Sequence, residues 1–210
     1  MSKVLILGGY GNFGKRVARL LTRQDIPVII AGRDANKAQI LAQALPEGLA
    51  ETAIFDARQT LSEKLKALSP TVVINTCGPF QTSDYAVAET CIKHEVHYID
   101  LADGRNFVTN IRTLDGKAKR NNVAVISGAS TVPGLTSAVI EHLRPQFSAI
   151  DWLDFGIAPG QKAERGLATT QAILGYVGKK LKPCAGYGAR YGWQDLHLQK
   201  YPGIGSRGKL

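Results

Sequence analysis

A glycine-rich segment near the N-terminus has the residue types and the spacing that bind phosphate groups. Residues 9–14 read Gly-Tyr-Gly-Asn-Phe-Gly and match the pattern G-x-G-x-x-G between an expected strand and an expected helix. In that context Gly9 allows a tight turn, Gly11 lets a pyrophosphate approach the main chain, and Gly14 lets the helix pack on the strand. The amide groups at the positive end of this helix would then face the phosphates. A glycine turn without a ligand is the alternative interpretation.

The end of the expected second strand bears on the choice between two nucleotides. The tripeptide Gly32-Arg33-Asp34 stands where NAD-preferring sites usually place a carboxylate that bonds the adenosine ribose. The planar guanidinium of Arg33 can hold a 2′-phosphate and stack on adenine, which favours NADP over NAD. In the competing interpretation Asp34 binds the ribose and Arg33 is a solvent-facing charge. Asp34 is also a candidate N-cap for the next helix.

Two further strand ends meet the same crevice, because ligands of open parallel sheets bind at the carboxyl ends of the strands. Asp56 follows the expected third strand, where its carboxylate can accept from the adenine amino group or cap the next helix. The expected fourth strand leads into a stiff Gly-Pro loop, which we expect beside the nicotinamide ribose. The cofactor-binding candidates in this loop are Asn75, Cys77, Gly78 and Pro79.

Expected strands and helices alternate along the first 127 residues and would position these side chains. Apolar or β-branched runs predict strands at 3–8, 28–31, 53–55, 71–75, 96–100 and 123–126. Helical spacing predicts helices between them, with apolar faces that include Val17, Leu20 and Leu21, then Ala38, Ile40, Leu41 and Leu45, and one helix over much of 106–121. We therefore predict an α/β fold, a doubly wound parallel (Rossmann) sheet over 1–130, followed by the beginning of a smaller α+β domain over 131–210.

The second domain is expected to contain a helix closed by Pro145, a strand at 150–157 and a helix at 167–181. In that last helix Tyr176 and Lys180 fit Y-x-x-x-K, the acid–base pair of short-chain dehydrogenases, and would share one face. The serine that usually precedes this pair is missing, since Ala163 stands at its position, and Gly178 weakens the helix. The pair is therefore an alternative catalytic site rather than the first choice.

Composition excludes several classes of protein. Hydrophobic residues make up 44% and charged residues 20%, so general disorder is excluded. The net charge of +9 suggests nucleic acid, but the basic cluster 179–182 lacks interleaved aromatic residues, and we expect no such partner. No apolar run is long enough to span a membrane. Three scattered cysteines fit a reducing, cytoplasmic compartment, and no cysteine or histidine spacing predicts a metal site.

Several segments together resemble the saccharopine dehydrogenase-like family. They are residues 9–14, 31–33, 75–80, 98–100 and 133–134, and the resemblance extends from residue 1 to about residue 175. It implies an N-terminal Rossmann domain that binds NADP or NAD. It also implies a second α+β domain, inserted after the sixth strand, that carries much of the substrate site. The cofactor contacts that it implies are Gly11, Asn12, Phe13, Arg33 and Gly78.

The same resemblance places Asp100 and the loop 102–104 near the reacting end, so Asp100 is the catalytic candidate, with a role in orienting the substrate. Many relatives have a Gly-Glu pair after the fifth strand, whereas this chain has Asp103-Gly104-Arg105, so no role for a glutamate carries over. The family is also considerably longer than 210 residues. We therefore expect a truncated or shortened member that lacks most of the substrate domain.

These observations predict an NADP-dependent oxidoreductase, or its cofactor-binding portion, that transfers a hydride between nicotinamide and an unidentified small substrate. One alternative is a non-catalytic NADP-binding module that regulates a partner. Another is a short-chain-type reductase or epimerase that uses Tyr176 and Lys180. We expect a small-molecule substrate and no membrane contact. The apolar surface of an unfinished second domain would favour a homo-oligomer.

Overall fold

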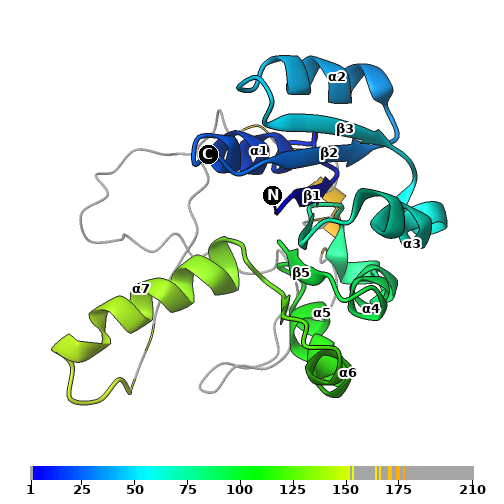
Figure 1. The fold of residues 1–210 in the computed structure, drawn as a ribbon. Helices are drawn as coiled ribbons and strands as arrows, with labels where there is room; N and C mark the ends of the chain where they lie inside the picture. The colour runs from blue at the N-terminus through cyan, green and yellow to red at the C-terminus, as the bar shows by residue number, and fades with distance from the viewer. Residues whose placement is uncertain are drawn as a thin grey trace. The chain divides into compact units, whose positions relative to one another are not determined.

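Six parallel strands form one sheet in the computed structural model, which describes residues 2–151, 153, 164, 166, 170, 171, 174, 175 and 177. The strand order is β3-β2-β1-β4-β5-β6 (Figure 1). The strands are β1 (Val4–Leu7), β2 (Val28–Gly32), β3 (Ala50–Ile54), β4 (Val72–Asn75), β5 (His97–Asp100) and β6 (Val125–Ile126). The order reverses between β1 and β4, which confirms the predicted doubly wound sheet and marks the place where ligands of such sheets bind.

Helices connect the strands. They are α1 (Gly14–Thr22), α2 (Ala35–Gln43), α3 (Ala57–Leu68), α4 (Ala86–Lys93), α5 (Arg105–Asn110), α6 (Asp115–Arg120) and α7 (Thr136–Leu143). Single 3₁₀ turns occupy Phe80–Thr82, Ile111–Leu114 and Arg144–Gln146, and a π-helical turn occupies Thr131–Leu135. The single helix expected over 106–121 is therefore two short helices joined by a 3₁₀ turn. The expected third strand begins and ends earlier than predicted.

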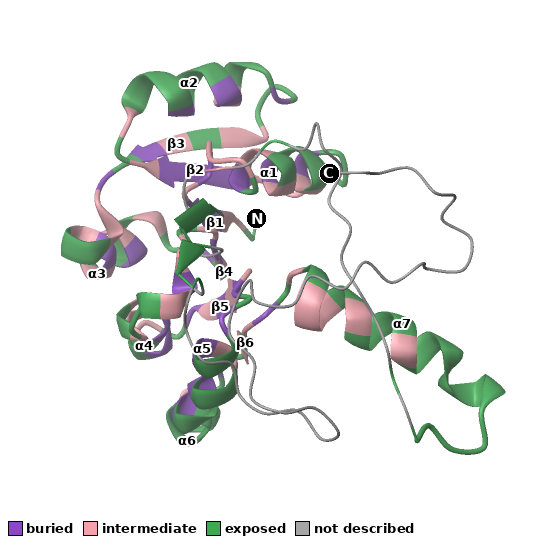
Figure 2. Cartoon of the chain, turned by 180° about the vertical axis from the view of Figure 1, so that it is seen from behind, coloured by how far each residue is buried: buried purple, intermediate pink, exposed green. Residues whose placement is uncertain are grey.

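Alternate residues of the central strands face two separate hydrophobic cores, as the two-residue period of a strand requires. Leu5, Leu7 and Ile29 pack with residues of α3, α4, α5 and α6 on one face of the sheet. Ile6 and Ile30 pack with residues of α1 and α2 on the other face. Strands β1 and β2 are buried on both faces, which explains why their sequences are continuously apolar rather than alternating (Figure 2).

One residue in each of two predicted helical faces differs from the sequence prediction. Leu20 of α1 and Ile40 of α2 are 62% and 58% exposed, although both were assigned to apolar faces. The buried residues of α1 are Gly14, Ala18 and Thr22, which are spaced by four residues and form one stripe. These side chains are small, so α1 packs close to the sheet. Hydrophobicity alone did not reveal this stripe, because its members are less apolar than the exposed leucine.

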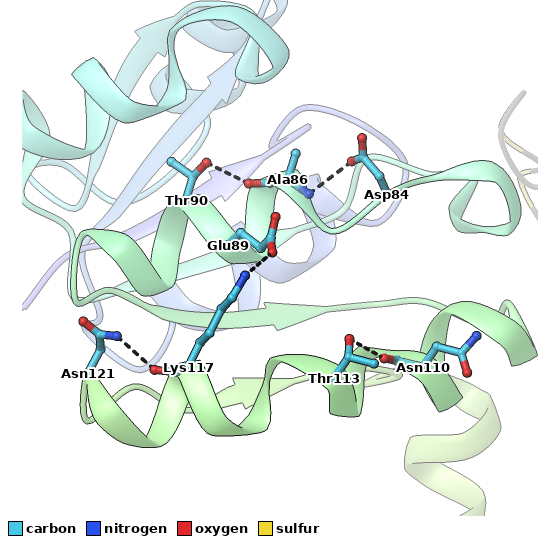
Figure 3. A network of polar contacts seen from close by, with 8 residues as sticks. All are labelled: Asp84, Ala86, Glu89, Thr90, Asn110, Thr113, Lys117 and Asn121. Atoms are coloured by element: carbon cyan, nitrogen blue, oxygen red, sulfur yellow. Dashed lines mark hydrogen bonds and ion pairs between the residues drawn. The ribbon is translucent and has the colours of Figure 1, made fainter.

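A polar contact links the helices on the α3–α6 face. Lys117 Nζ of α6 donates to Glu89 Oε1 of α4 over 2.8 Å, with the two helices side by side (Figure 3). Both side chains are about half exposed, so the ion pair contributes little to stability. The buried residues Ala88, Cys91 and Ala118 of the same helices belong to the core cluster and hold this layer in place.

Helix α7 follows β6 and has no buried residue (Figure 2). Contacts divide the chain into two units, residues 1–169 and 170–210, and all the elements named above belong to the first. The strand expected at 150–157 and the helix expected at 167–181 fall mainly outside the described residues, so the division at residue 130 stays a prediction. None of the helices described in the structure is long and apolar enough to cross a lipid bilayer.

Candidate functional site

The glycine loop between β1 and α1 is closely packed. A Cβ atom on Gly14 would lie 2.3 Å from the Gly8 carbonyl oxygen and 2.7 Å from the Gly9 Cα atom. A Cβ atom on Gly9 would meet the Ile30 side chain at 2.9 Å, and one on Gly11 would meet the Gly8 oxygen at 3.0 Å. The Gly11 amide donates to that same oxygen over 2.8 Å, which closes the turn. The three predicted glycines therefore fit positions where a side chain would disrupt the loop.

Gly8 makes the tight turn that the sequence analysis assigned to Gly9. Its φ angle of 71° lies in the left-handed region that favours glycine. A Cβ atom there would lie 2.9 Å from Thr76 Oγ1 and 3.0 Å from Cys77 Sγ. Thr76 Oγ1 also donates to the Leu7 carbonyl oxygen over 2.8 Å. The double glycine at the end of β1 was the available signal, and it brings the ends of β1 and β4 together.

The first turn of α1 has no side-chain cap and is in contact with Glu164. Phe13 is its N-cap, no side chain caps the turn, and the turn contains no acidic residue. Phe13 is 49% exposed. Lys15 lies in the same turn and pairs with Glu164 at 2.8 Å, while Asn12 Nδ2 donates to the Glu164 carbonyl oxygen over 3.0 Å. Uncapped amide groups at the positive end of a helix are suited to binding a phosphate.

A cavity of about 820 Å³ lies along the carboxyl ends of β1, β2, β3 and β4. Six predicted residues line it: Arg33, Asp56, Asn75, Cys77, Gly78 and Pro79. The other predicted residues do not line it: Gly9, Gly11, Asn12, Phe13, Gly14, Asp34 and Asp100. The lining residues that sequence reasoning missed include two with polar side chains, Tyr10 and Arg58. Tyr10 lies inside the glycine motif, where its variable position gave no signal, and Arg58 lies in the first turn of α3.

At the end of β2, the Arg33 side chain lines the cavity, whereas the Asp34 side chain caps helix α2. Asp34 is the N-cap of α2, and its Oδ1 accepts from the Lys37 amide over 3.0 Å. Its Oδ2 lies 3.3 Å from Lys37 Nζ. The Lys37 amide and ammonium groups lower the pKa of the Asp34 carboxyl. The carboxylate that would mark an NAD-preferring site is therefore engaged within α2.

Asp56 and Asn75 hold the loops that follow β3 and β4. Asp56 is the N-cap of α3, and its Oδ1 accepts from the Arg58 amide over 2.9 Å. The capping role is confirmed, and Asp56 also lines the cavity, where a contact with adenine stays a prediction. Asn75 is buried, and its Oδ1 accepts from the Cys77 amide over 3.0 Å. Its Nδ2 donates to the Tyr98 hydroxyl over 3.2 Å, which fixes the amide.

Cys77 lies at the cavity wall, where the charges of two guanidinium groups act on its thiol. Surrounding protein atoms raise the pKa of its thiol, while the charges of Arg33 and Arg58 act in the opposite direction and Asp56 adds to the increase. Burial is the largest of these effects, so the thiol is protonated at neutral pH and is a poor nucleophile. This agrees with the interpretation of Cys77 as a small apolar residue beside a ligand.

Asp100 ends β5 and is completely buried. Its Oδ1 accepts from the Ala102 amide, the Ser127 hydroxyl and the Gly128 amide over 2.8–3.0 Å. Its Oδ2 is buried and has no hydrogen-bond partner among the described residues. The structure thus places Asp100 below the surface of the site, joined to the loops that follow β5 and β6. Its contact with a substrate stays a prediction.

The family model of the saccharopine dehydrogenase NADP binding domain matches residues 4–126, from the first residue of β1 to the last residue of β6. The chain belongs to this family. The glycine loop, the β2 end and the cavity described above all lie in the matched region. The domain is therefore a nucleotide-binding Rossmann domain of a dehydrogenase family, as the sequence resemblance implied. A comparison with curated proteins gives no match.

Solved structures resemble parts of this chain at low sequence identity. An oxidoreductase of the short chain dehydrogenase/reductase family from Burkholderia thailandensis is 13% identical, with a TM-score of 0.47 over 69% of this chain and 76% of that one. The yeast methylglyoxal/isovaleraldehyde reductase Gre2, complexed with NADPH, is 18% identical, with a TM-score of 0.38 over 47% and 36%. The Bordetella bronchiseptica enzyme WbmG, in complex with NAD, is 17% identical, with a TM-score of 0.38 over 47% and 36%.

The alternative catalytic pair, Tyr176 and Lys180, lies outside the described residues. Its geometry therefore adds nothing to the site. The described residues contain no group of three or more histidine, cysteine or acidic side chains arranged to hold a metal ion. The site consists of the uncapped α1 turn, the glycine loop, and a cavity with two guanidinium groups.

Proposed function

We propose that the chain binds NADP(H) across the carboxyl edge of the sheet and serves an oxidoreductase that transfers a hydride to or from a small substrate. The observation that carries this proposal is the different placement of two neighbouring side chains at the β2 end. Arg33 faces the cavity, whereas the Asp34 carboxylate is engaged by Lys37. A cationic β2 end without a free carboxylate favours a 2′-phosphate over a ribose 2′-hydroxyl.

The residues present fit such a nucleotide. The diphosphate would lie over the glycine loop, where Gly11 and Gly14 leave no side chain in the way and the α1 turn has no cap. Arg33 would hold the 2′-phosphate through paired N–H donors. The loop after β4 would support the nicotinamide ribose, since Asn75 fixes the Cys77 amide from below. A bound nicotinamide would supply the hydride chemistry itself.

The chain's own residues would bind and orient the reactants. Asp100 is the candidate for a positioning role, because its carboxylate fixes Ala102 and Gly128, which lie in the two loops that follow β5 and β6 at the same sheet edge. We propose that these loops orient the substrate beside the nicotinamide. The uncharged Cys77 thiol and the ring of Pro79 would exclude water from that end of the cavity.

A second candidate function is a nucleotide-binding module without catalysis, whose occupancy regulates a partner. The observation that favours it is the complete burial of Asp100, since the one predicted catalytic residue does not line the cavity. Both functions require NADP(H) binding, and they differ only in turnover. Oxidation of NADPH in the presence of a broad panel of carbonyl and imine compounds supports the enzyme. Tight binding without turnover for any of them supports the module.

Titration of the purified chain with NADPH and NADH, followed by nucleotide fluorescence, tests the shared part of the proposal. We expect saturable binding of both nucleotides, with NADPH at least about tenfold tighter, because one charge-assisted contact contributes about 1.5–3 kcal/mol. Absence of binding for both nucleotides contradicts the proposed function. Tighter binding of NADH contradicts the role given to Arg33 while leaving the glycine loop in place.

A further inference from the structure

The phenol of Tyr10 joins the glycine loop to the end of β2. Its hydroxyl oxygen accepts from the Arg33 amide and from the Asp34 amide, each over 2.9 Å. Its ring lies against Gly32, where an added Cβ atom would come within 2.3 Å of Cε1. The hydroxyl therefore stands at the place where a Rossmann fold receives the adenosine ribose. Tyr10 lines the same cavity as the Arg33 side chain.

With these two amide contacts made, the Tyr10 hydroxyl is left to act as a hydrogen-bond donor. A phenolic oxygen can accept through its lone pairs and donate one proton. Two N–H groups occupy the accepting side, and no acceptor for the proton is present among the described residues. Hydrogen bonds accepted by a hydroxyl polarise it and strengthen the bond that it donates. Tyr10 thus presents a polarised O–H donor at the edge of the cavity.

The ring is held well enough for the hydroxyl to stay in place when a ligand binds. Tyr10 packs against the core cluster beneath α1 and α2, together with Val17 and Leu21. Gly32 provides the flat main-chain surface on which the ring rests. Moving the ring aside would break both amide hydrogen bonds and expose this apolar contact. A ligand at the β2 end therefore meets the hydroxyl rather than the bare amides.

We propose that Tyr10 is a specificity-determining residue, whose hydroxyl donates to the 2′-phosphate of NADP(H) beside the Arg33 guanidinium. The inference rests on the proposed function and adds a second recognition group to it. A phosphate oxygen is a charged acceptor, and hydrogen bonds to charged acceptors are about twice as strong as neutral ones. The 2′-hydroxyl of the NAD(H) ribose is a neutral acceptor, so its hydrogen bond with the same donor is weaker. Tyr10 therefore increases the preference for the phosphorylated nucleotide.

The test is Tyr10→Phe, which keeps the ring and removes only the hydroxyl. Two pairs of ligands are titrated by calorimetry, NADPH against NADH and 2′,5′-adenosine diphosphate against 5′-adenosine monophosphate. We expect the affinity for both 2′-phosphorylated ligands to fall about tenfold, and the affinity for their partners to fall less than about twofold. Tyr85→Phe is the matched control, because it removes a phenol that donates to Phe107 and does not line the cavity.

Gly32→Ala provides an independent second variant, since the new methyl group displaces the Tyr10 ring instead of truncating it. We expect the same loss of 2′-phosphate selectivity in this variant, with the thermal unfolding midpoint confirming that it folds. Unchanged selectivity in Tyr10→Phe, or tighter NADPH binding because the freed amides bind the phosphate directly, overturns the inference alone. Failure of the unmodified chain to bind either nucleotide overturns the proposed function together with this inference.

Discussion

Arg33 and Asp34 are adjacent in sequence, yet they serve different parts of the molecule. The Asp34 side chain accepts a hydrogen bond from the Lys37 amide in the first turn of α2, while the Arg33 side chain lines the cavity. The sequence placed both residues at the β2 end and left their roles open. A carboxylate before a helix can cap it or bind a ribose, and only the direction of the side chain decides between these roles. That direction depends on the start of α2, which the sequence locates to within a residue or two.

Replacement of Arg33 tests the origin of nucleotide preference. We expect Arg33→Ala to weaken NADPH binding by about 1–3 kcal/mol and NADH binding by much less, because a charge-assisted phosphate contact is lost. Fluorescence titration of both nucleotides measures the two changes. Arg112→Ala is the control, since this exposed arginine removes the same charge from a position outside the cavity. Equal losses for both nucleotides would contradict the assignment of Arg33.

The Cys77 thiol gives a pH-dependent prediction. Because burial raises its pKa above the ordinary value, the reactive thiolate is scarce at neutral pH and increases as the pH rises. We expect the rate of alkylation by iodoacetamide to keep rising at pH values where a free cysteine has reached its plateau. Mass spectrometry of the Cys77 peptide, with Cys77→Ser as the blank, follows the reaction. A plateau at or below the pH of free cysteine is the contradicting result.

The same thiol reports on Arg33, because the guanidinium charge lowers the pKa that burial raises. Removal of that charge in Arg33→Ala should therefore slow the alkylation of Cys77 at a fixed pH near 8. Arg112→Ala should leave the rate unchanged. A faster reaction in Arg33→Ala would show that the arginine shields the thiol rather than acting through its charge.

At the scale of elements, helix α3 depends on its N-cap residue, Asp56. Asp56→Ala removes the side chain that accepts from the Arg58 amide and leaves the first turn uncapped. We expect the free energy of unfolding to fall by about 0.5–2 kcal/mol, measured by urea denaturation. Asp56→Asn is the matched control, because asparagine caps a helix about as well as aspartate. An equal loss in both variants would assign the effect to charge rather than to capping.

Helix α1 shows where element-level prediction fails. Its existence and its start after the glycine motif were predictable, because strand, glycine turn and helix follow each other in a recognisable order. Its buried face was predictable only in part, because Val17 and Leu21 pack against the core as expected, whereas Ala18 and Thr22 are the buried residues and Leu20 faces solvent. Because α1 packs close to the sheet, this face requires small side chains. A search of the sequence for large apolar residues does not find a face of this kind. The tertiary contact, rather than the hydrophobic pattern, determines the orientation of this helix.

A pair of substitutions in α1 tests this account. Ala18 is completely buried, so Ala18→Leu inserts three carbons into a packed space and should destabilise the fold by about 1–3 kcal/mol. Leu20 is 62% exposed, and Leu20→Ala should change stability by no more than about 0.5 kcal/mol. Urea denaturation of both variants measures the difference. If Leu20→Ala proves the more damaging change, the described orientation of α1 is wrong.

At the scale of the whole molecule, ligand binding should add to the stability of the domain. Binding to the folded state alone stabilises it by RT ln(1 + [L]/Kd), which is about 2.7 kcal/mol when the free ligand is at 100 times its Kd. We expect NADPH to raise the thermal unfolding midpoint at that concentration. 5′-Adenosine monophosphate at the same concentration, which lacks the 2′-phosphate and the nicotinamide half, should produce a much smaller increase. An unchanged midpoint with NADPH would argue against a folded-state site.

The strand order and the place of the site could be predicted at this scale, because alternating strands and helices with short connections allow few topologies. Beyond β6, the predicted helix closed by Pro145 corresponds to α7, but its packing could not be predicted, since α7 has no buried residue that would tie its pattern to a core. The contribution of Tyr10 could not be predicted from the sequence either. Its partners, Gly32 and the amides of Arg33 and Asp34, lie 22 or more positions away along the chain and meet it only in the folded sheet.

Asp100 links the end of β5 to the residues that follow β6 through several hydrogen bonds. Its Oδ1 binds Ser127 and Gly128, and its main-chain oxygen accepts from the Ala129 amide over 2.9 Å. Across the ladder it is in register with Asn75, which lines the cavity. Any force that pulls on 127–129 must break these bonds or move the tip of β5, so tension applied beyond β6 is transmitted through β5 to β4, whose last residue lines the cavity.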